Sequence, residues 1–410
     1  MIVTKLPGPR AATMRPRLAQ VLSERGLMSN QQNFTRDLLL RPDLGEWSEQ
    51  LLSLRGCSRP IRLRGMWMKV DKNGEILSEH STDDLPAKAM LVRCGNRRAS
   101  VCPSCSHEYK GDMWHLLSAG TSGGKGVPES VATHPMIFLT LTAPSFGPVH
   151  SATSPNSKKR CHPRDGRCEH GRPRGCFDRH ADGDDEVGTP ICEDCYDYDA
   201  HVTWQWWAPE LWRRFTISMY RRLAERLRMS EKQLKSEARL QFVKVAEFQA
   251  RGAIHFHALI RLDAPSADLG PYRPSDLHVK ARELAEAAIQ AAHALTVARP
   301  TPSGDEVVLQ FGRQIDARVV QKGTDGIAPG KVAAYLAKYA TKSSGDEYGL
   351  DGSRFRKCHA MRLRRHARKA VSADRTGEYR MLRKWCSGIA FRGHFSSKSR
   401  AFSTTLSELR

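Results

Sequence analysis

Two histidines and one glutamate have the residue types and the spacing that a catalytic metal site needs. His255 and His257 lie two positions apart in the stretch 253–260, where apolar residues alternate as in a strand with one buried face. If residues 250–252 form a three-residue hairpin loop, Glu247 on the preceding strand lies directly opposite His255. Two imidazoles and one carboxylate on one face suit an open site for Mg²⁺ or Mn²⁺. A histidine pair can also be purely structural, and substituting both residues would separate the two interpretations.

A second motif, in the stretch 331–342, offers a nucleophile. Tyr335 and Tyr339 lie one helical turn apart, and Lys338 and Lys342 each follow a tyrosine by three residues. The same positions also fit the apolar stripe of an ordinary core helix, which is the commoner meaning of such a pattern. Beside a two-histidine metal site, however, the pattern favours catalytic tyrosines over ordinary core residues. The reaction that fits these residues is attack of a tyrosine hydroxyl on a phosphodiester. A phenol with a pKa of about 10 is a weak nucleophile unless a metal polarises the phosphate, and the lysines can offset the negative charge that develops on the phosphate.

Eleven cysteines cluster along the chain, and in a reducing compartment such clusters indicate metal sites rather than disulfides. Two Cys-x-x-Cys pairs have the spacing of zinc ligands, and neither lies in a thioredoxin-like context. The first predicted zinc site consists of Cys57, Cys94, Cys102 and Cys105. The second consists of Cys168, Cys176, Cys192 and Cys195, with Cys161, His170 and His180 as open alternatives. We therefore expect one or two structural Zn²⁺ ions in addition to the catalytic metal.

Positive charge dominates the composition, with 65 Lys and Arg against 44 Asp and Glu and a formal net charge of +21. This surplus predicts a polyanionic partner, and nucleic acid is the first choice. An acidic membrane surface, or solubility alone, is the less favoured explanation. No run of 18 apolar residues is present and no apolar secretory segment begins the chain, so we expect a cytoplasmic protein that does not span a membrane.

From residue 136 onward, strand-like and helix-like hydrophobic patterns alternate. Strands are expected at 136–142, 239–248, 253–262 and 307–320, the last of these as one strand or two. Helices are expected at 204–228, 275–298 and 331–342. The order strand, helix, strand, strand, helix, strand, helix fits an α+β fold with a ferredoxin-like antiparallel sheet.

Three regions are expected along the chain. Residues 1–130 are expected to form an N-terminal arm and a zinc-knuckle region, and residues 131–345 the domain that carries the histidine and tyrosine motifs. Within that domain, residues 148–200 are polar and rich in Gly, Pro, Cys and His, so this insertion needs metal to hold it. Residues 346–410 form a basic C-terminal region.

Several stretches together carry a resemblance to a known family. They are Gly56–Gly65, Arg93–Arg98 with Cys102–Cys105, Phe138–Ser145, Cys195–His201 with Ala208–Arg214, and Phe391–Ser396. Over roughly residues 55–405 the chain resembles the Rep initiators of actinobacterial plasmids and integrative conjugative elements. These belong to the two-tyrosine type of the HUH endonuclease superfamily, named for its histidine-hydrophobic-histidine motif.

The resemblance implies a fold and a role for each motif. The core would be the ferredoxin-like or RRM-like HUH nuclease core. Phe138–Ser145 matches the strand motif of the superfamily. His255 and His257 match its metal motif, with a carboxylate at Glu247. Tyr335 and Tyr339 match its tyrosine motif.

The resemblance also implies rolling-circle replication of a plasmid. The protein would bind the double-strand origin and nick one strand at a single-stranded or hairpin site. It would then hold the 5′ end as a phosphotyrosine while a host polymerase extends the 3′-OH. The stretch Gly123–Gly126 lacks the first glycine and the Ser or Thr of a P-loop, so unwinding would need a host helicase.

Two other functions remain open. A two-tyrosine HUH transposase would share the histidines, the tyrosines and a zinc knuckle, although the Phe391–Ser396 stretch favours the replication initiator. A non-catalytic, zinc-dependent DNA-binding regulator would explain the charge and the cysteines. It would leave the arrangement of glutamate, histidines and tyrosines as a coincidence.

Overall fold

The structure is a computed structural model that describes residues 42–154, 158–265, 271–321, 326–342 and 354–409. The chain divides into two compact units, residues 1–109 and residues 110–410. Helix α4 (Pro103–Ser122) runs across this division. Among the described helices, none has the length and apolar character needed to cross a membrane.

The first unit is built from short elements around a small core. In chain order they are α3 (Leu44–Ser53), β1 (Ile61–Leu63), β2 (Met66–Val70), β3 (Ile76–Ser81), the 3-10 turns η2 (Thr82–Asp84) and η3 (Pro86–Lys88), and β4 (Met90–Val92). β1 pairs with β4, and β2 pairs with β3, both antiparallel. All five residues of β2 are exposed, so its hairpin contributes no apolar core to this unit. The buried residues gather instead around Leu54 and three cysteines.

The second unit has a longer sequence of elements. They are η4 (Glu129–Thr133), β5 (Met136–Leu141), α5 (Tyr198–Leu227), α6 (Glu231–Glu237), β6 (Arg239–Phe248), β7 (Ile254–Asp263), α7 (Ala281–His293), β8 (Val297–Pro300), β9 (Glu306–Leu309), β10 (Ile315–Val319), α8 (Pro329–Lys342), α9 (Arg354–Ser372), η6 (Arg380–Trp385), β11 (Ser396–Lys398), η7 (Arg400–Phe402) and α10 (Leu406–Leu409). The fold is therefore mixed α and β, as expected.

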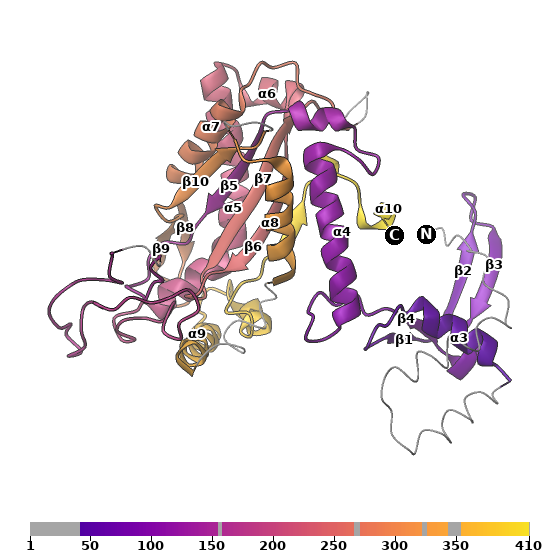
Figure 1. Ribbon diagram of the computed structural model, residues 1–410, viewed down its shortest axis with the longest axis horizontal. Helices are drawn as coiled ribbons and strands as arrows, with labels where there is room; N and C mark the ends of the chain where they lie inside the picture. The colour runs from indigo at the N-terminus through magenta and orange to yellow at the C-terminus, as the bar shows by residue number, and fades with distance from the viewer. Residues whose placement is uncertain (1–41, 155–157, 266–270, 322–325, 343–353, 410) are drawn as a thin grey trace. The chain divides into compact units, whose positions relative to one another are not determined.

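Five strands form the main sheet in the order β10-β5-β7-β6-β11, and every neighbouring pair is antiparallel. Helices α5 and α7 cover one face, and α8 lies against the other (Figure 1). A separate two-stranded ladder joins β8 to β9. Helices therefore cover both faces of the sheet at strands β7 and β6.

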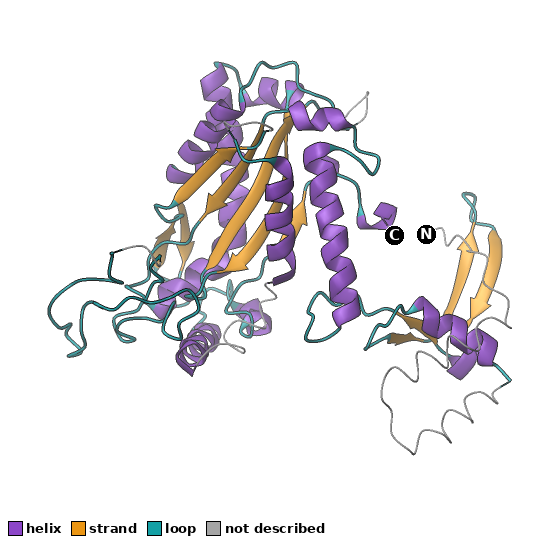
Figure 2. Cartoon of the chain, viewed as in Figure 1, coloured by secondary structure: helices purple, strands orange, loops and turns teal. Residues whose placement is uncertain are grey.

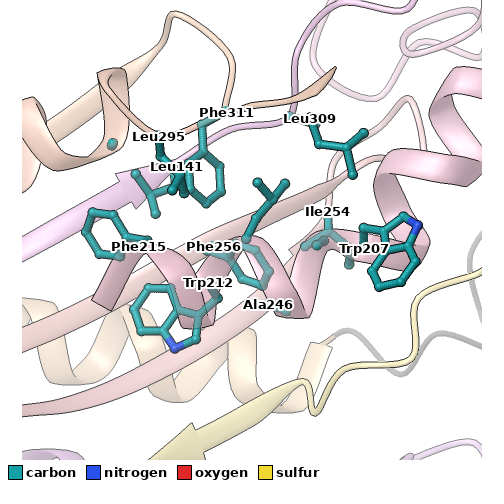
Figure 3. Close-up of a cluster of buried hydrophobic side chains, with 14 of the residues drawn as sticks. Leu141, Trp207, Trp212, Phe215, Ala246, Ile254, Phe256, Leu295, Leu309 and Phe311 are labelled. Atoms are coloured by element: carbon teal, nitrogen blue, oxygen red, sulfur yellow. The ribbon is translucent and has the colours of Figure 1, made fainter. Parts of the chain in front are cut away.

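The face toward α5 holds the main hydrophobic core. Strand β7 alternates, so Ile254, Phe256 and Ile260 point into this core with at most 2% exposure. Phe256 packs beside Trp212 of α5, with ring centroids 5.9 Å apart (Figure 3). Burial of one such aromatic side chain stabilises the fold by about 1.5–3 kcal/mol. The alternation leaves the histidines of β7 on the opposite face, toward α8.

The insertion between β5 and α5 contains no named helix or strand among its described residues, and it is drawn as loop (Figure 2). Isolated bridges provide its regular backbone pairing, for example His162 with Cys176 and Arg167 with Pro173. The expected helix 275–298 is shorter, because residues 297–300 pair with β9 as strand β8. Thr296 and Val297 are β-branched, which lowers helix propensity at this point.

The C-terminal residues differ from the expected separate basic region. Strand β11 extends the main sheet by pairing with β6. Leu363 of α9, Tyr379 and Phe391 are fully buried in the main core. Because these residues complete both the sheet and its core, the described C-terminal segment belongs to the second unit.

Candidate functional site

A tight hairpin joins β6 to β7 and aligns the predicted metal ligands. Glu247 is the register partner of His255, as expected from the sequence. The backbone N–H of Gln249 donates to the Ala253 carbonyl, which closes a three-residue loop over 250–252. Gly252 has φ of 81°, a left-handed conformation that suits glycine at the end of such a loop. The loop geometry therefore places Glu247 and both histidines on one face.

His257 lies at the centre of the site. Its Nε2 is 3.5 Å from the Glu247 carboxylate and 3.4 Å from the Tyr335 hydroxyl. Its Nδ1 is 3.2 Å from the hydroxyl of Thr140, the residue that pairs with it across β5. The Phe138 ring stacks on the imidazole at 5.8 Å. Sequence spacing did not single out Thr140, whose position becomes evident only from the β5–β7 register.

His255 lies beside His257, with ring centroids 4.4 Å apart. Its Nε2 is buried and has no hydrogen-bond partner among the described residues. Burial, followed by the proximity of His257 and Arg251, lowers the pKa of His255 to about 3. The imidazole is therefore neutral at neutral pH, and it has a free nitrogen of the kind that binds a divalent cation.

The tyrosine helix α8 packs through a different set of residues from its tyrosines. Val332, Leu336 and Ala340 are buried, whereas Tyr335 remains 38% exposed and Tyr339 is half-buried. The tyrosines consequently flank the apolar face of α8 and are not its core residues. This arrangement argues against the interpretation of the tyrosine pair as an ordinary core stripe.

Both tyrosine rings lie next to His257. The ring centroids are 5.2 Å from His257 for Tyr335, 5.8 Å for Tyr339, and 4.5 Å between the two tyrosines. Burial, together with the neighbouring Tyr339 and Glu247, raises the pKa of Tyr335 above its ordinary value. The Lys338 ammonium lies 5.6 Å from the Tyr339 ring centroid. Lys342 is the last residue of α8.

The donor set of the hairpin fits a divalent cation that leaves positions open for substrate oxygen. Glu247 supplies a carboxylate, and each histidine supplies one nitrogen. Within the described residues, the ligand atoms of these three do not form one of the groups gathered within 4.8 Å. Ion binding would therefore require the side chains to rotate toward one another.

The first predicted zinc set comes together in the first unit. Cys57, Cys94, Cys102 and Cys105 have sulfur atoms that all lie within 4.8 Å of one another. The Cys94 backbone N–H donates to the Cys57 sulfur at 3.3 Å. Four cysteine sulfurs at this spacing fit a tetrahedral zinc ion.

The second predicted zinc set is not brought together as expected. Cys168, Cys192 and Cys195 cluster with His170, whose Nδ1 lies 3.3 Å from the Cys195 sulfur. Cys176 lies in a different cluster, so it is replaced by His170 in this one. The backbones of Arg167 and Pro173 pair, and this pairing closes a small turn that contains both Cys168 and His170. Spacing alone did not reveal this turn.

Comparison with known proteins assigns a family to the chain. The family model of RepSA, described as "Replication initiator protein, pSAM2", matches residues 43–410. A relative named "Replication initiator protein" from Streptomyces ambofaciens is 39% identical over 383 residues, covering 90% of this chain and 79% of that protein. No solved structure gives a significant match. The chain therefore belongs to the RepSA family of replication initiator proteins.

Proposed function

We propose that this chain initiates rolling-circle replication of a plasmid by nicking one DNA strand at the double-strand origin. The observation that carries this proposal is the position of His257. Its Nε2 lies 3.4 Å from the Tyr335 hydroxyl and 3.5 Å from the Glu247 carboxylate. A candidate nucleophile on α8 and a candidate metal ligand set on β6 and β7 thus lie on the same side of the sheet. The function of the family, replication initiation, makes DNA the expected substrate.

The fold supports an HUH-type core. Along the chain, α5 and the short α6 lie between the sheet strands β5 and β6, and α7 with the β8–β9 ladder lies between β7 and β10. The sheet places β7 between β5 and β6, with β10 outside β5. This strand order agrees with a split β-α-β sheet of the ferredoxin-like kind, and the agreement supports the proposed core. The histidines then lie on a central strand, where both neighbouring strands fix their orientation.

The proposed reaction is attack of a tyrosine hydroxyl on a phosphodiester. The Tyr335 oxygen forms a bond to phosphorus while the bond from phosphorus to the 3′ oxygen breaks. The phenol proton passes to water, and the departing 3′ oxygen takes up a proton to become a free hydroxyl. A divalent cation, when bound by Glu247, His255 and His257, supplies polarisation of the phosphate oxygen. The product is a 5′-phosphotyrosine and a 3′-OH primer.

Neighbouring residues would support this attack in distinct ways. Because the pKa of Tyr335 is raised, its phenol is protonated at neutral pH and must lose its proton during attack. Lys338, and Lys342 at the end of the helix, would offset the negative charge that develops on the phosphate. Tyr339, whose ring lies 4.5 Å from that of Tyr335, could attack a second strand while the first remains attached. Unwinding and extension would be the work of a host helicase and polymerase.

A cleavage assay on a labelled single-stranded origin hairpin with Mn²⁺ tests the proposal. Wild type should give a covalent protein–DNA adduct on a denaturing gel, and Tyr335→Phe with Tyr339→Phe should abolish it. The two single variants then show which tyrosine attacks. His255→Ala with His257→Ala should also abolish cleavage while leaving the zinc content unchanged.

Two outcomes would redirect the assignment. Undiminished adduct in the double tyrosine variant would remove the tyrosines from the reaction. No adduct from folded wild type on any strand of the origin would favour a non-catalytic DNA-binding initiator. A two-tyrosine transposase would instead cut the ends of its own element in preference to an origin hairpin.

A further inference from the structure

The insertion contains a second donor cluster that is separate from the three cysteines and His170. His150, Cys161, Cys176 and His180 each offer one ligand atom, and these atoms all lie within 4.8 Å of one another. The His180 Nε2 is 3.1 Å from the His150 Nδ1 and 3.4 Å from the Cys176 sulfur. Three of the four residues are buried.

Backbone pairing brings these four residues together from distant positions. The His162 and Cys176 backbones exchange two hydrogen bonds, which sets Cys161 beside Cys176. The Thr153 N–H donates to the His180 carbonyl, and the His150 N–H donates to the Thr189 carbonyl. The donors therefore converge from three segments of a loop.

The surroundings of the cluster are those of a metal site. The Glu186 carboxylate lies 3.7 Å from the His180 Nδ1, the nitrogen on the other side of that ring from Cys176, and 4.0 Å from the His150 Nδ1. A carboxylate on the outer nitrogen is the usual partner of a histidine that ligates through its other nitrogen. The Ser151 N–H donates to the Cys161 sulfur at 3.3 Å. A carboxylate and a backbone N–H therefore lie next to the cluster, as they commonly do around bound metal ions.

The cluster is connected to the catalytic hairpin through Gly188. The Gly188 N–H donates to the His150 carbonyl at 2.8 Å. Gly188 has φ of +91°, and a Cβ placed on it would lie 2.3 Å from the Ala250 carbonyl. The backbone at Gly188 therefore packs directly on the loop that joins Glu247 to His255.

We propose that His150, Cys161, Cys176 and His180 bind a third structural zinc ion, and that this ion holds the insertion against the β6–β7 loop. Two thiolates and two imidazoles form a tetrahedral set that fits zinc. Binding releases two thiol protons to solvent and leaves both imidazoles neutral. The four residues are positioning residues, because none of them is among the proposed reacting groups.

The zinc content of the purified full-length protein tests the metal site without any DNA. We expect three zinc ions per chain in wild type and two in Cys161→Ser. Cys358→Ser is the matched control and should retain three, because Cys358 belongs to none of the three clusters. Three zinc ions per chain in Cys161→Ser would overturn the third site. So would a wild-type protein with fewer than three zinc ions, if Cys161→Ser contained the same number.

A second variant covers the case in which Cys161→Ser does not fold. His180→Cys retains four zinc-binding donors, three thiolates and one imidazole, so it should fold and keep three metal ions. With Co²⁺ in place of zinc, absorption from sulfur-to-metal charge transfer should rise above that of wild type, because one more thiolate binds. Unchanged absorption would mean that residue 180 is not a ligand.

The effect on the hairpin rests on the proposed nicking function and needs its own pair of variants. Gly188→Val introduces the clash with Ala250, whereas Gly183→Val changes a glycine of similar φ, +107°, with open space around it. We expect both to keep three zinc ions. Only Gly188→Val should raise the Mn²⁺ concentration for half-maximal cleavage, by roughly 10-fold.

Equal Mn²⁺ dependence in the two glycine variants would overturn the positioning role. If wild type nicks no DNA, the proposed function fails, while the zinc count still decides the metal site. The two failures are therefore distinguishable.

Discussion

The main sheet and the insertion beside it are ordered by different forces. The sheet buries aromatic and aliphatic side chains from β5, β7 and α5 in one continuous core. In its described part, the insertion lacks named helices and strands, and two groups of Cys and His donors converge within it. Apolar burial stabilises the sheet whether or not metal ions are present, whereas a cluster of Cys and His donors stabilises the insertion only when it binds its ion. The β6–β7 hairpin therefore lies between a core that is ordered by apolar burial and an insertion whose order is expected to depend on metal.

The first unit resembles the insertion more than the sheet. Its strands β1 and β2 are exposed along their whole length, and its buried cluster consists of Leu54 with three of the four cysteines. Small units with little apolar core usually need a metal or disulfides for stability. We therefore expect zinc to order this unit as well.

Removal of zinc should give the largest difference between the two kinds of region. A strong chelator should abolish amide hydrogen-exchange protection in residues 158–180, because structural zinc contributes on the order of 10–16 kcal/mol in small zinc-dependent modules. Residues 254–263 of β7 should stay protected. Exchange resolved by peptide measures both in one experiment.

Re-addition of zinc is the control for chelator damage, and it should restore protection in the insertion. If the insertion stays protected without metal, its order does not depend on the donor clusters. Loss of protection in β7 at the same chelator concentration would show that the two regions unfold together.

A cavity in the core should produce the opposite pattern. Phe256→Ala removes a side chain with 0% exposure that packs between Trp212 and Phe391. We expect the free energy of unfolding to fall by about 3–5 kcal/mol, while the folded variant keeps its zinc ions. Denaturant titration gives the first quantity and metal analysis the second.

Phe138→Leu is a comparison variant, because Phe138 is only half-buried and lies on the face with His257. It should cost less stability than Phe256→Ala. Loss of zinc from folded Phe256→Ala would contradict the separation of the two regions.

Local patterns predicted the geometry of the β6–β7 hairpin well. A three-residue loop ending in Gly252 determines the β6–β7 register, so Glu247 opposite His255 followed from spacing alone. The role of Thr140 did not follow, because it depends on the pairing of β5 with β7 across more than 100 residues of sequence. The sequence was sufficient to predict the geometry of the short hairpin, but not the pairing of strands that are far apart in the chain.

The zinc ligands show the same limit. The Cys-x-x-Cys pairs were recognisable because two of the ligands are close in sequence. Their partners come from a loop whose path has no hydrophobic periodicity to reveal it, so Cys176 was assigned to the wrong cluster. The C-terminal strand β11 was missed for a related reason. It has only three residues, Ser-Ser-Lys, and its place in the sheet comes from pairing with β6.

A smaller effect should come from His359, which connects α9 to the loop between β6 and β7. The imidazole is 3.0 Å from the Arg251 carbonyl and 3.3 Å from the Tyr198 hydroxyl. Burial lowers its pKa to about 4, from an ordinary value of 6.5. The unfolded chain therefore binds more protons than the folded chain between these two pH values. Stability is fully present above pH 6.5 and falls as the pH drops toward 4, by at most about 3 kcal/mol.

His359→Gln preserves a hydrogen-bonding side chain but does not titrate, so it should flatten the dependence of unfolding free energy on pH between about 4 and 6.5. Denaturation midpoints over this range, measured with excess zinc, give the slope for each protein. His366→Gln is the control, since His366 is more exposed and pairs with Asp199 at 2.8 Å. An equal slope in wild type and His359→Gln would place the acid sensitivity elsewhere. A flattened slope would show that protonation of His359 lowers the free energy of unfolding. The effect would act at the contact between α9 and the β6–β7 loop.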